Sequence, residues 1–300
     1  MKIRIGTRGS DLALWQADYV AERLGRRQTE IIIIRTQGDS IQNISFEKME
    51  GKGFFTKEIE NALLEKSIDL AVHSLKDLPT DSPPGLCIAA IPVREEPSDV
   101  LLIRPEALDA GRILHLRENA IVGTSSVRRL AQIKHADPTL KVQPLRGNVT
   151  TRLRKLREGS YDAIMLAHAG IARLELDISA FHMYILPFDI FLPAPAQGAL
   201  GLQVRTDDEQ TRSVIRKLNH EDTELAVTAE REFLKHFGGG CHIPLGALAT
   251  IEAGCIHLTG IIAATDGSKT MRQSVSGSDP KKIGAELARI LKAQGAAELL

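Results

Sequence analysis

The sequence lacks an excess of charge of either sign. Its 300 residues include 38 Lys or Arg and 38 Asp or Glu, so the formal net charge is zero at pH 7. Proteins that bind nucleic acid broadly need a surplus of basic residues to neutralise phosphates. The balance therefore argues against nucleic acid as a partner.

Long apolar runs and cysteines are also scarce. No run approaches the length of a membrane-spanning helix, and the opening residues, MKIRIGTRGSDLALWQ, lack the apolar core of a signal peptide. The three cysteines, Cys87, Cys241 and Cys255, are odd in number and form no Cys-x-x-Cys pair, which disfavours structural disulfides. We therefore expect a cytoplasmic protein of about two or three domains that does not contact a membrane.

Positive charge is nevertheless concentrated in one stretch. Between Thr124 and Arg157 the chain has nine Lys or Arg and a single acid, Asp137. A local surplus of this size, within a neutral chain, predicts an anionic ligand.

The start of this stretch has the pattern of an anion site at a helix N-terminus. A short apolar strand at 120–123 is followed by Thr124, Ser125 and Ser126, and then by an apolar-periodic helix. Hydroxyls and unpaired amide donors at a helix start favour negative charge.

Guanidinium groups extend the pattern. Arg128 and Arg129 follow the hydroxyls, and a second turn of Arg146, Gly147 and Asn148 precedes another basic helix. Arginine matches carboxylate or phosphate geometry with two parallel donors. The alternative interpretation is a solvated basic face after two ordinary helix caps.

Two parts of the chain repeat one pattern. Gly51–Asp77 and Arg146–Gly170 both show a glycine-containing turn, a Thr, an amphipathic helix, an Asp and a buried strand. We interpret them as two similar α/β lobes whose strand ends and helix starts face each other across a cleft. The alternative is that βα units resemble one another for general physical reasons.

Proline-rich segments at 91–97 (IPVREEP) and 186–198 (LPFDIFLPAPAQG) are too rich in proline for continuous elements and predict two crossings between the lobes. A continuous β-branched run at 30–35 predicts a central parallel strand covered on both faces. The polar segment 36–53 predicts a mobile loop. From Glu221 we expect a long helix reaching Gly238, followed by a small α+β domain.

Cys241 follows three consecutive glycines that leave the backbone free to approach a ligand. Its thiol is a candidate nucleophile or attachment point. The alternatives are a flexible turn with an incidental cysteine, and a zinc site formed by Cys241, His242, Cys255 and His257.

The sequence HSLKD, at the end of a predicted strand, places His73, Ser74, Lys76 and Asp77 where α/β folds hold ligands. Asp77 is the natural carboxylate to stabilise a developing cation or to move a proton. The alternative is a surface turn before Pro79.

Seven motifs together resemble the porphobilinogen deaminase family. In chain order they are GTRGSDLALWQA, GKGFFTKE, AVHSLKDLP, GTSSVRR, LRGNVTTRL, PAPAQGA and GGGCHIPLG. The resemblance covers residues 3 to about 246, with weaker similarity to the end.

The resemblance implies an α/β fold with two periplasmic-binding-protein-like (type II) lobes around a cleft and a small C-terminal α+β domain. The first lobe would comprise residues 1–96 with 197–217, the second residues 97–196, and the C-terminal domain residues 218–300.

The implied activity is that of hydroxymethylbilane synthase, a transferase. Such an enzyme joins four porphobilinogen molecules head to tail with loss of ammonia, and water then frees the linear tetrapyrrole. The family carries a dipyrromethane cofactor in thioether linkage to a cysteine that matches Cys241, and Asp77 matches its catalytic carboxylate. No metal is implied, and we expect a monomer.

The remaining family positions are matched residue by residue. Those implied to contact the cofactor are Ser74, Lys76, Thr124, Ser125, Ser126, Arg128, Arg129, Arg146, Gly147 and Asn148. Those implied to contact the substrate are Arg8, Ser10, Lys52, Arg152, Arg173 and Gln197. The chain departs from the family in an extra proline within PAPAQG and in Gly238, where an acid is common.

A second class of function also fits the two-lobe interpretation, namely a non-catalytic cytosolic binding protein for a carboxylated small molecule. Cys241 separates the two, because a binding protein has no need of a covalently primed thiol.

Overall fold

The computed structural model describes residues 2–36, 56–240 and 243–300. It divides into two compact units, one of Met1–Glu95 with Gly198–Leu225 and one of Glu96–Gln197 with Ala226–Leu300. Residues 37–53 of the predicted mobile loop lie outside the described part. Within that part, no helix is both long and apolar enough to cross a membrane.

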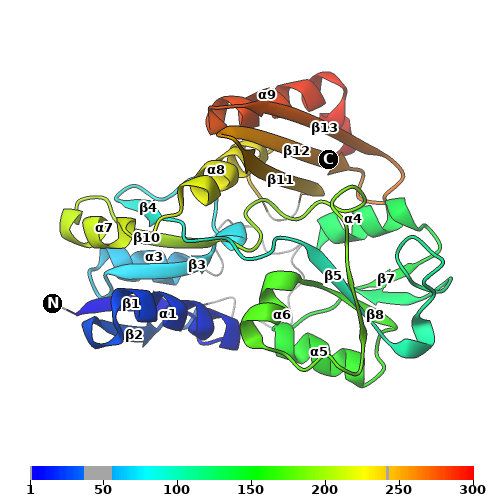
Figure 1. The fold of residues 1–300 in the computed structure, drawn as a ribbon, viewed down its shortest axis with the longest axis horizontal. Helices are drawn as coiled ribbons and strands as arrows, with labels where there is room; N and C mark the ends of the chain where they lie inside the picture. The colour runs from blue at the N-terminus through cyan, green and yellow to red at the C-terminus, as the bar shows by residue number, and fades with distance from the viewer. Residues whose placement is uncertain (1, 37–55, 241–242) are drawn as a thin grey trace. The chain divides into compact units, whose positions relative to one another are not determined.

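The first unit is built on one mixed sheet. Its strands are β1 (Ile3–Thr7), β2 (Thr29–Ile33), β3 (Leu70–Ser74), β4 (Leu86–Ala90) and β10 (Leu200–Arg205). They are arranged in the order β2-β1-β3-β10-β4 (Figure 1). β1 pairs in parallel with β2 and β3, whereas β10 is antiparallel to β3 and β4.

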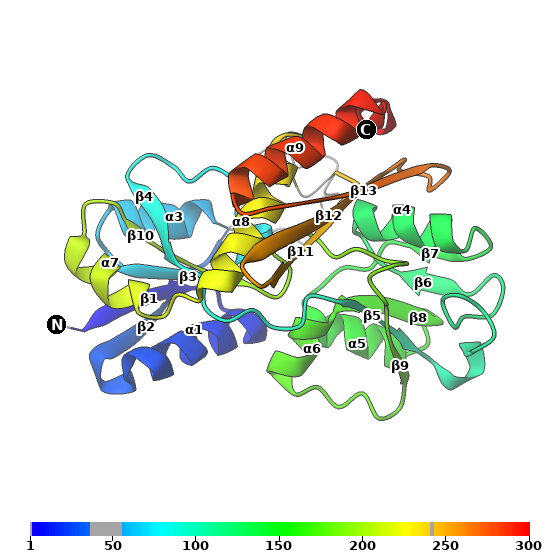
Figure 2. The same ribbon diagram turned by 45° about the horizontal axis from the view of Figure 1, so that its top comes forward.

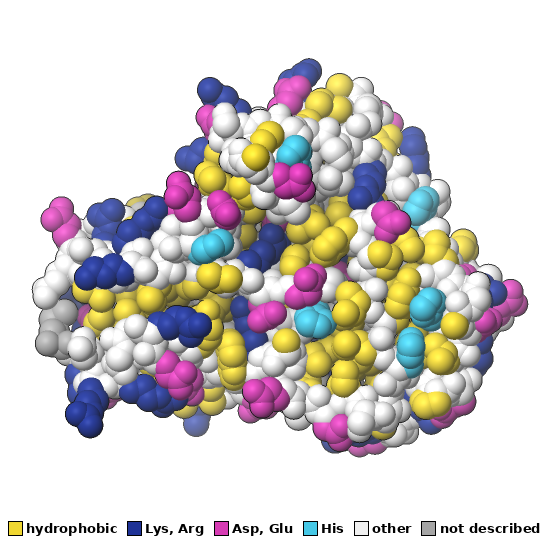
Figure 3. Space-filling view, viewed as in Figure 1, with side chains coloured by type: hydrophobic (Ala, Val, Ile, Leu, Met, Phe, Trp, Pro, Cys, Tyr) yellow, Lys and Arg dark blue, Asp and Glu magenta, His cyan; other side chains and the backbone are white. Residues whose placement is uncertain are grey.

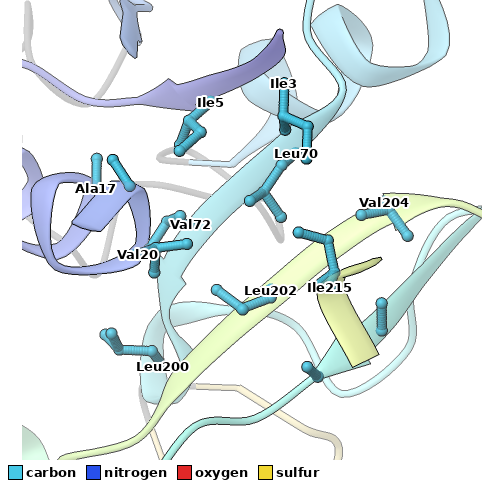
Figure 4. Packing of buried hydrophobic residues seen from close by; sticks show 13 residues of the cluster. Ile3, Ile5, Ala17, Val20, Leu70, Val72, Leu200, Leu202, Val204 and Ile215 are labelled. Atoms are coloured by element: carbon cyan, nitrogen blue, oxygen red, sulfur yellow. The ribbon is translucent and has the colours of Figure 1, made fainter. Parts of the chain in front are cut away.

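Helices cover both faces of this sheet. They are α1 (Asp11–Leu24), α3 (Lys57–Leu64) and α7 (Glu209–Arg216), with short 3-10 turns η1 (Arg26–Gln28) and η3 (Leu75–Asp77). On one face of the sheet, strand residues such as Ile5 and Val72 pack with Val20 of α1 (Figure 4). Ile215 of α7 belongs to the same core. α3 packs its buried stripe, which includes Ile59, against the opposite face.

The position predicted for the run 30–35 is wrong. Its parallel pairing is confirmed, but β2 lies at the edge of the sheet with β1 as its neighbour, and Ile33 is 57% exposed. A β-branched run indicates a strand that fits a pleated surface. It does not reveal which strands lie on either side, because that depends on segments far away in the chain.

The second unit contains a sheet of the same design. Its strands are β5 (Asp99–Ile103), β6 (Ile121–Gly123), β7 (Lys141–Gln143), β8 (Ala163–Ala167) and β9 (His182–Ile185), in the order β7-β6-β8-β5-β9. β6 is parallel to β7 and β8, whereas β5 is antiparallel to β8 and β9. Order and directions match the first sheet position by position, so the prediction of two similar α/β lobes is confirmed.

Equivalent aspartates support this likeness in detail. Asp69, just before β3, accepts a hydrogen bond from the backbone N–H of Arg4 at 3.0 Å. Asp162, just before β8, accepts one from the backbone N–H of Ile121 at 2.7 Å. Each carboxylate also pairs with an arginine side chain, Arg4 or Arg117. General βα physics does not require this repeated side-chain bond.

Helices also lie on both faces of the second sheet (Figure 1). They are α4 (Val127–Ala136), α5 (Val149–Arg157) and α6 (His168–Leu174), and a 3-10 turn, η4, spans Pro105–Ala107. Ile133 of α4 packs with Leu101 on one face, and Leu156 of α5 packs with Leu102 on the other. Successive residues of β5 thus serve different cores, as the pleat of a strand requires.

The proline-rich segments contain no regular element, as predicted. The chain passes from β4 to β5 across residues 91–98 and from β9 to β10 across residues 186–199 without a helix or strand. They contain two of the three places where the chain passes from one unit to the other; the third, between Leu225 and Ala226, lies within a helix near the end of the chain.

The end of the chain forms an antiparallel sheet with two long helices. Its elements are α8 (Glu221–Lys235), β11 (Leu245–Glu252), β12 (Cys255–Ala263), β13 (Thr270–Gly277), α9 (Pro280–Ala293) and the turn η5 (Ala296–Leu299). Both helices lie on one face (Figure 2). A Cβ on Gly260 would come within 2.7 Å of Phe233 and 2.8 Å of Leu287, so only glycine allows this approach.

Two details of this region differ from the prediction. α8 ends at Lys235 rather than at Gly238, and Gly238 and Gly239 then take positive φ values of 97° and 68°. β13 was not predicted, because its sequence, TMRQSVSG, has few apolar residues. It is an edge strand whose residues are half-buried or exposed.

Candidate active site

In the first unit, a buried strand ends in an exposed carboxylate. β3 runs into the turn η3, where Leu75 is fully buried and Asp77 is exposed. Ser74 is held from α1, because Nε2 of the buried Gln16 donates to its Oγ at 2.7 Å. The buried Leu75 therefore anchors the turn that presents Asp77 to solvent, and Lys76 is half-buried beside it.

A buried polar chain runs beneath this turn. Nε2 of His73 donates to Oε1 of Gln203 at 3.0 Å, and Nε2 of Gln203 donates to Oε1 of Glu60 at 3.1 Å. Burial lowers the pKa of His73 to about 4, so the imidazole is neutral at pH 7. Burial also raises the pKa of the Glu60 carboxyl. The chain links strands β3 and β10 to helix α3.

At the end of β1, Arg8 and Ser10 are both half-buried. Ser10 occupies the N-cap position of α1, and its side chain makes no capping hydrogen bond. The preceding Thr7 is buried and donates from Oγ1 to the carbonyl of Ala13 at 2.9 Å. The turn between β1 and α1 is thus held by Thr7, as the equivalent turn of the second unit begins with the buried Thr124.

In the second unit, the predicted hydroxyl donors serve the turn itself. Oγ1 of Thr124 accepts from the N–H of Ser126 at 3.2 Å, and Oγ of Ser126 accepts from the N–H of Arg129 at 3.4 Å. Oγ of Ser125 donates to the carbonyl of Leu145 at 2.9 Å. Because the hydroxyl proton of Ser125 is already bonded, this side chain can only accept a hydrogen bond from a ligand. The donors that suit an anion are the first backbone amides of α4.

The strand directions bring one more residue to this place. β6 and β8 are parallel, so their carboxyl ends meet, and antiparallel β5 begins where β8 ends, with Asp99 opposite Ala167. We call this end of the second sheet its carboxyl edge. It gathers the turn before α4, the start of α6 and Asp99.

Arg128 and Arg129 are buried at the carboxyl edge and share the carboxylate of Asp99. Nη1 of Arg128 donates to Asp99 Oδ2 at 2.6 Å and to the carbonyl of Leu192 at 2.8 Å. Arg129 donates to Asp99 Oδ1 from Nε at 3.0 Å and Nη2 at 2.7 Å, and to the carbonyl of Met165 from Nη1 at 2.9 Å. The alternative of a solvated basic face is therefore wrong for these two residues.

Charge explains why this buried carboxylate remains ionised. Burial acts to raise the pKa of Asp99, but the adjacent Arg128 and Arg129 more than offset it and hold that pKa well below its ordinary value. Burial in turn lowers the pKa of the Arg128 guanidinium, which Asp99 opposes.

Gln197 is fully buried at the same edge. Its Nε2 donates to the carbonyl of Pro97 at 2.8 Å and to Asp99 Oδ1 at 3.0 Å. Gln197 closes the second crossing and Pro97 belongs to the first. The amide therefore joins both crossings to Asp99, Arg128 and Arg129, which we call the Asp99 cluster.

The second basic turn is held by the helix that follows it. Gly147 has φ +111°, and a Cβ there would lie 2.6 Å from Thr151. Oδ1 of Asn148 caps α5 by accepting from the N–H of Thr151 at 2.8 Å, and Nε of Arg152 donates to the carbonyl of Gly147 at 2.8 Å. Arg146 is half-buried, and in α6 Arg173 is buried.

Three residues predicted to belong to a site lie outside the described part of the chain. Lys52 and Cys241 are outside it, as is His242 of the zinc alternative. His257, the other imidazole of that alternative, bonds through Nδ1 to Oγ of Ser276 at 2.8 Å. Among the described residues, no three His, Cys, Asp or Glu side chains come together as metal ligands.

Sequence reasoning missed Asp99. The available signal was an acid directly before a buried apolar run, DVLLI, but nothing in that pattern identifies its partners. Those partners come from α4, nearly thirty residues later in the chain, and their meeting depends on how β5 is placed beside β8.

Two sheets of one topology, each followed by polar turns after its parallel strands, define an α/β protein with two similar lobes. The chain is similar to a solved structure of an ancestral cationic amino acid solute-binding protein. The match covers 72% of this chain and 87% of that protein, with 13% sequence identity and a TM-score of 0.44.

Family models identify the chain more closely. The model described as porphobilinogen deaminase, dipyromethane cofactor binding domain, matches residues 3–213, and that of the porphobilinogen deaminase C-terminal domain matches residues 224–293. Porphobilinogen deaminase of Syntrophomonas wolfei is 45% identical over 99% of this chain and 97% of its own length. That of Chlorobium phaeovibrioides is 43% identical over 99% of the chain and 96% of its length.

The chain therefore belongs to the porphobilinogen deaminase family. Its activity is that of a hydroxymethylbilane synthase, a transferase, and its cofactor is dipyrromethane.

The carboxyl edge suits the acidic side chains of such a cofactor. Among the described residues, Nε and Nη2 of Arg128 have no hydrogen-bond partner, so one edge of its guanidinium remains available. The first-turn amides of α4 and the half-buried Arg146 add donors of the same kind. Acetate and propionate groups are acceptors only, so this donor set fits them.

Proposed function

We propose that this chain joins four porphobilinogen molecules head to tail and releases hydroxymethylbilane, with Cys241 attaching the primer and Asp77 acting as the catalytic carboxylate. The observation that carries the residue assignment is the exposed Asp77, which follows a buried strand and an anchoring leucine. Because this carboxylate is exposed to solvent, a substrate can reach it directly.

The second unit would recognise the acidic side chains of the pyrroles. Hydrogen bonds to charged groups contribute about 1.5 to 3 kcal/mol each, so a few per ring retain a growing polyanion. When bound, dipyrromethane supplies the pyrrole to which the first substrate unit is joined. We assign the cofactor side chains to Thr124, Ser125, Ser126, Arg128, Arg129, Arg146, Gly147 and Asn148, with Ser74 and Lys76 from the first unit. We assign the substrate side chains to Arg8, Ser10, Lys52, Arg152, Arg173 and Gln197.

Asp77 would act on the charge that the reaction creates. When the C–N bond of porphobilinogen breaks, both electrons leave with nitrogen, which departs as ammonia, and the pyrrole becomes electron-poor. A nearby carboxylate stabilises the resulting positive charge and can accept a hydrogen bond from a pyrrole N–H.

We also propose the domain division 1–96 with 197–217, 97–196 and 218–300. It is supported by contact units that change at residues 95/96 and 197/198 and by a family C-terminal domain that starts at residue 224. We further propose a monomer that works in the cytoplasm. Free thiols at Cys87 and Cys255 are the state that a reducing compartment maintains.

The covalent primer gives the first test. Intact-mass measurement of the active enzyme should show an addition equal to two linked pyrroles, and Cys241→Ala should lack it. Cys255→Ala serves as the matched control and should keep the addition. Active protein of unmodified mass would refute the assignment of Cys241.

Asp77 gives the second test, which also separates an enzyme from a binding protein. Asp77→Asn should keep the primer and the fold but lose turnover by about 100-fold or more, because a charge-stabilising group is absent from the transition state. Asp81→Asn, at an exposed acid four residues later, should turn over normally. Steady-state rates of both variants decide, and near-normal turnover in Asp77→Asn removes that residue from its role.

A further inference from the structure

The Asp99 cluster carries an excess of positive charge in a buried place. One carboxylate with a fully buried side chain faces two guanidiniums, those of Arg128 and Arg129, whose side chains are 5% and 7% exposed. The three groups together carry one net positive charge. An uncompensated buried charge is costly, so this arrangement favours a further anion at the cluster.

The hydrogen bonds divide the two arginines by task. Each nitrogen of the Arg129 guanidinium donates to a protein oxygen, either of Asp99 or of Met165. In Arg128, by contrast, both bonds come from Nη1. Asp99 and the carbonyl of Met165 therefore hold all three nitrogens of Arg129, whereas the edge of Arg128 formed by Nε and Nη2 makes no bond to these acceptors.

Gln197 holds the carboxylate from the other side. Its amide reaches Asp99 Oδ1 at 3.0 Å while it also bonds to the carbonyls of Pro97 and Ser98. Oδ1 thus accepts from Gln197 and from two nitrogens of Arg129, so the carboxylate cannot rotate without losing several bonds. Such a group suits the task of orienting others.

We propose that Asp99 is a positioning residue that orients Arg128 so that its Nε and Nη2 edge receives a carboxylate of the pyrrole chain. The proposal rests on the proposed function, in which Arg128 binds the cofactor. Asp99 itself would not touch the ligand. Without its charge the two guanidiniums would repel each other, and Arg128 would lose the bond that sets its direction.

Asp137 offers a matched control on the same helix. It is also buried, its carboxylate pairs with Arg112 at 2.9 Å, and it caps the opposite end of α4. At 1.5 Å per residue, that end lies on the order of 14 Å from Arg128. Asp137→Asn therefore removes the charge of a buried, ion-paired carboxylate from α4 without disturbing Arg128 or Arg129.

The experiment compares the wild-type holoenzyme with Asp99→Asn and Asp137→Asn. Primer occupancy is measured by intact mass, stability by thermal unfolding, and KM and kcat on the primed protein. Both variants should lose stability. Only Asp99→Asn should also lose primer occupancy or raise KM about 10-fold, which is roughly 1.4 kcal/mol of binding.

Asp99→Glu keeps the test decisive if Asp99→Asn does not fold. It retains the charge but moves the carboxylate by one methylene, so it should fold and raise KM several-fold while primer occupancy persists. If the folded Asp99 variants match Asp137→Asn in occupancy and KM, the positioning role is overturned. A wild-type protein that lacks the primer or the activity would instead overturn the proposed function, so the two failures are distinguishable.

Discussion

At the scale of single residues, His73 is a histidine whose proton affinity is set by its surroundings. The ring is buried within the first unit and donates from Nε2 to Gln203, and burial lowers its pKa to about 4. An unfolded chain would hold the same imidazole near its ordinary pKa of about 6.5. The folded state therefore excludes a proton that the unfolded state accepts.

This difference predicts how stability depends on pH. Above about pH 6.5 both states are neutral at His73 and its contribution is fully present. As the pH falls towards 4, the unfolded state gains a proton first, and stability drops by up to roughly 3 kcal/mol. His73→Gln keeps a nitrogen donor for Gln203 but cannot titrate. Urea unfolding from pH 7 to pH 4 should show the wild type losing its advantage over this variant, and a constant difference would contradict the prediction.

Asp69 acts in a different pH window. Burial acts to raise its pKa, but hydrogen bonds from Arg4 and Arg205 dominate and bring it to about 2. Its stabilisation is present above the ordinary pKa near 4 and is lost as the pH falls towards 2. It therefore does not interfere with the His73 comparison between pH 7 and pH 4.

At the scale of elements, β10 completes a sheet whose other strands precede it by more than a hundred residues. It lies between β3 and β4 and is antiparallel to both. Its last residue, Arg205, donates from Nη1 to the carbonyls of Leu63 and Ile68 at 3.0 and 2.6 Å, and from Nη2 to Asp69 at 3.1 Å. Without β10, the first sheet would lose its bonds to β4 and its buried cation.

This placement predicts which fragment folds alone. Residues 1–95 joined to 198–225 through a short Gly-Ser linker should unfold cooperatively in urea, because this chain contains every strand of the first sheet. The ends to be joined are close, since the N–H of Glu95 donates to the carbonyl of Gly198 at 3.2 Å. Residues 1–95 alone should show no cooperative transition by circular dichroism. A folded 1–95 fragment would show that β10 is dispensable.

The Gly-Thr pairs near the ends of β1 and β6 show how much local sequence can predict at this scale. Gly6 and Gly123 precede equivalent turns, and a Cβ at either would lie within 3.0 Å of a packed side chain. The Gly-Thr pattern thus indicated both turns correctly. The hydroxyls after Gly123 were also correctly placed at a helix start. Composition does not reveal that each of these hydroxyls makes a hydrogen bond to a backbone group of the protein.

At the scale of the whole molecule, neutrality and local charge coexist. On the face drawn in Figure 3, basic and acidic side chains are interspersed, in keeping with 38 residues of each kind. Part of the positive charge within the stretch 124–157 is not at the surface. Arg128 and Arg129 are buried, and both form ion pairs with the one carboxylate of Asp99. A charge count along the chain therefore overstates what a ligand meets.

By itself, the sequence determined the repeated α/β pattern, the proline-rich crossings, the family and the positions of Asp77 and Cys241 in its motifs, because these depend on residues close together in the chain. Only the tertiary structure decided that β2 lies at an edge, that β10 enters the first sheet and that Asp99 meets Arg128 and Arg129. The physical reason is that strand neighbours and buried ion pairs are chosen by packing between distant segments, and local periodicity carries no information about distant partners.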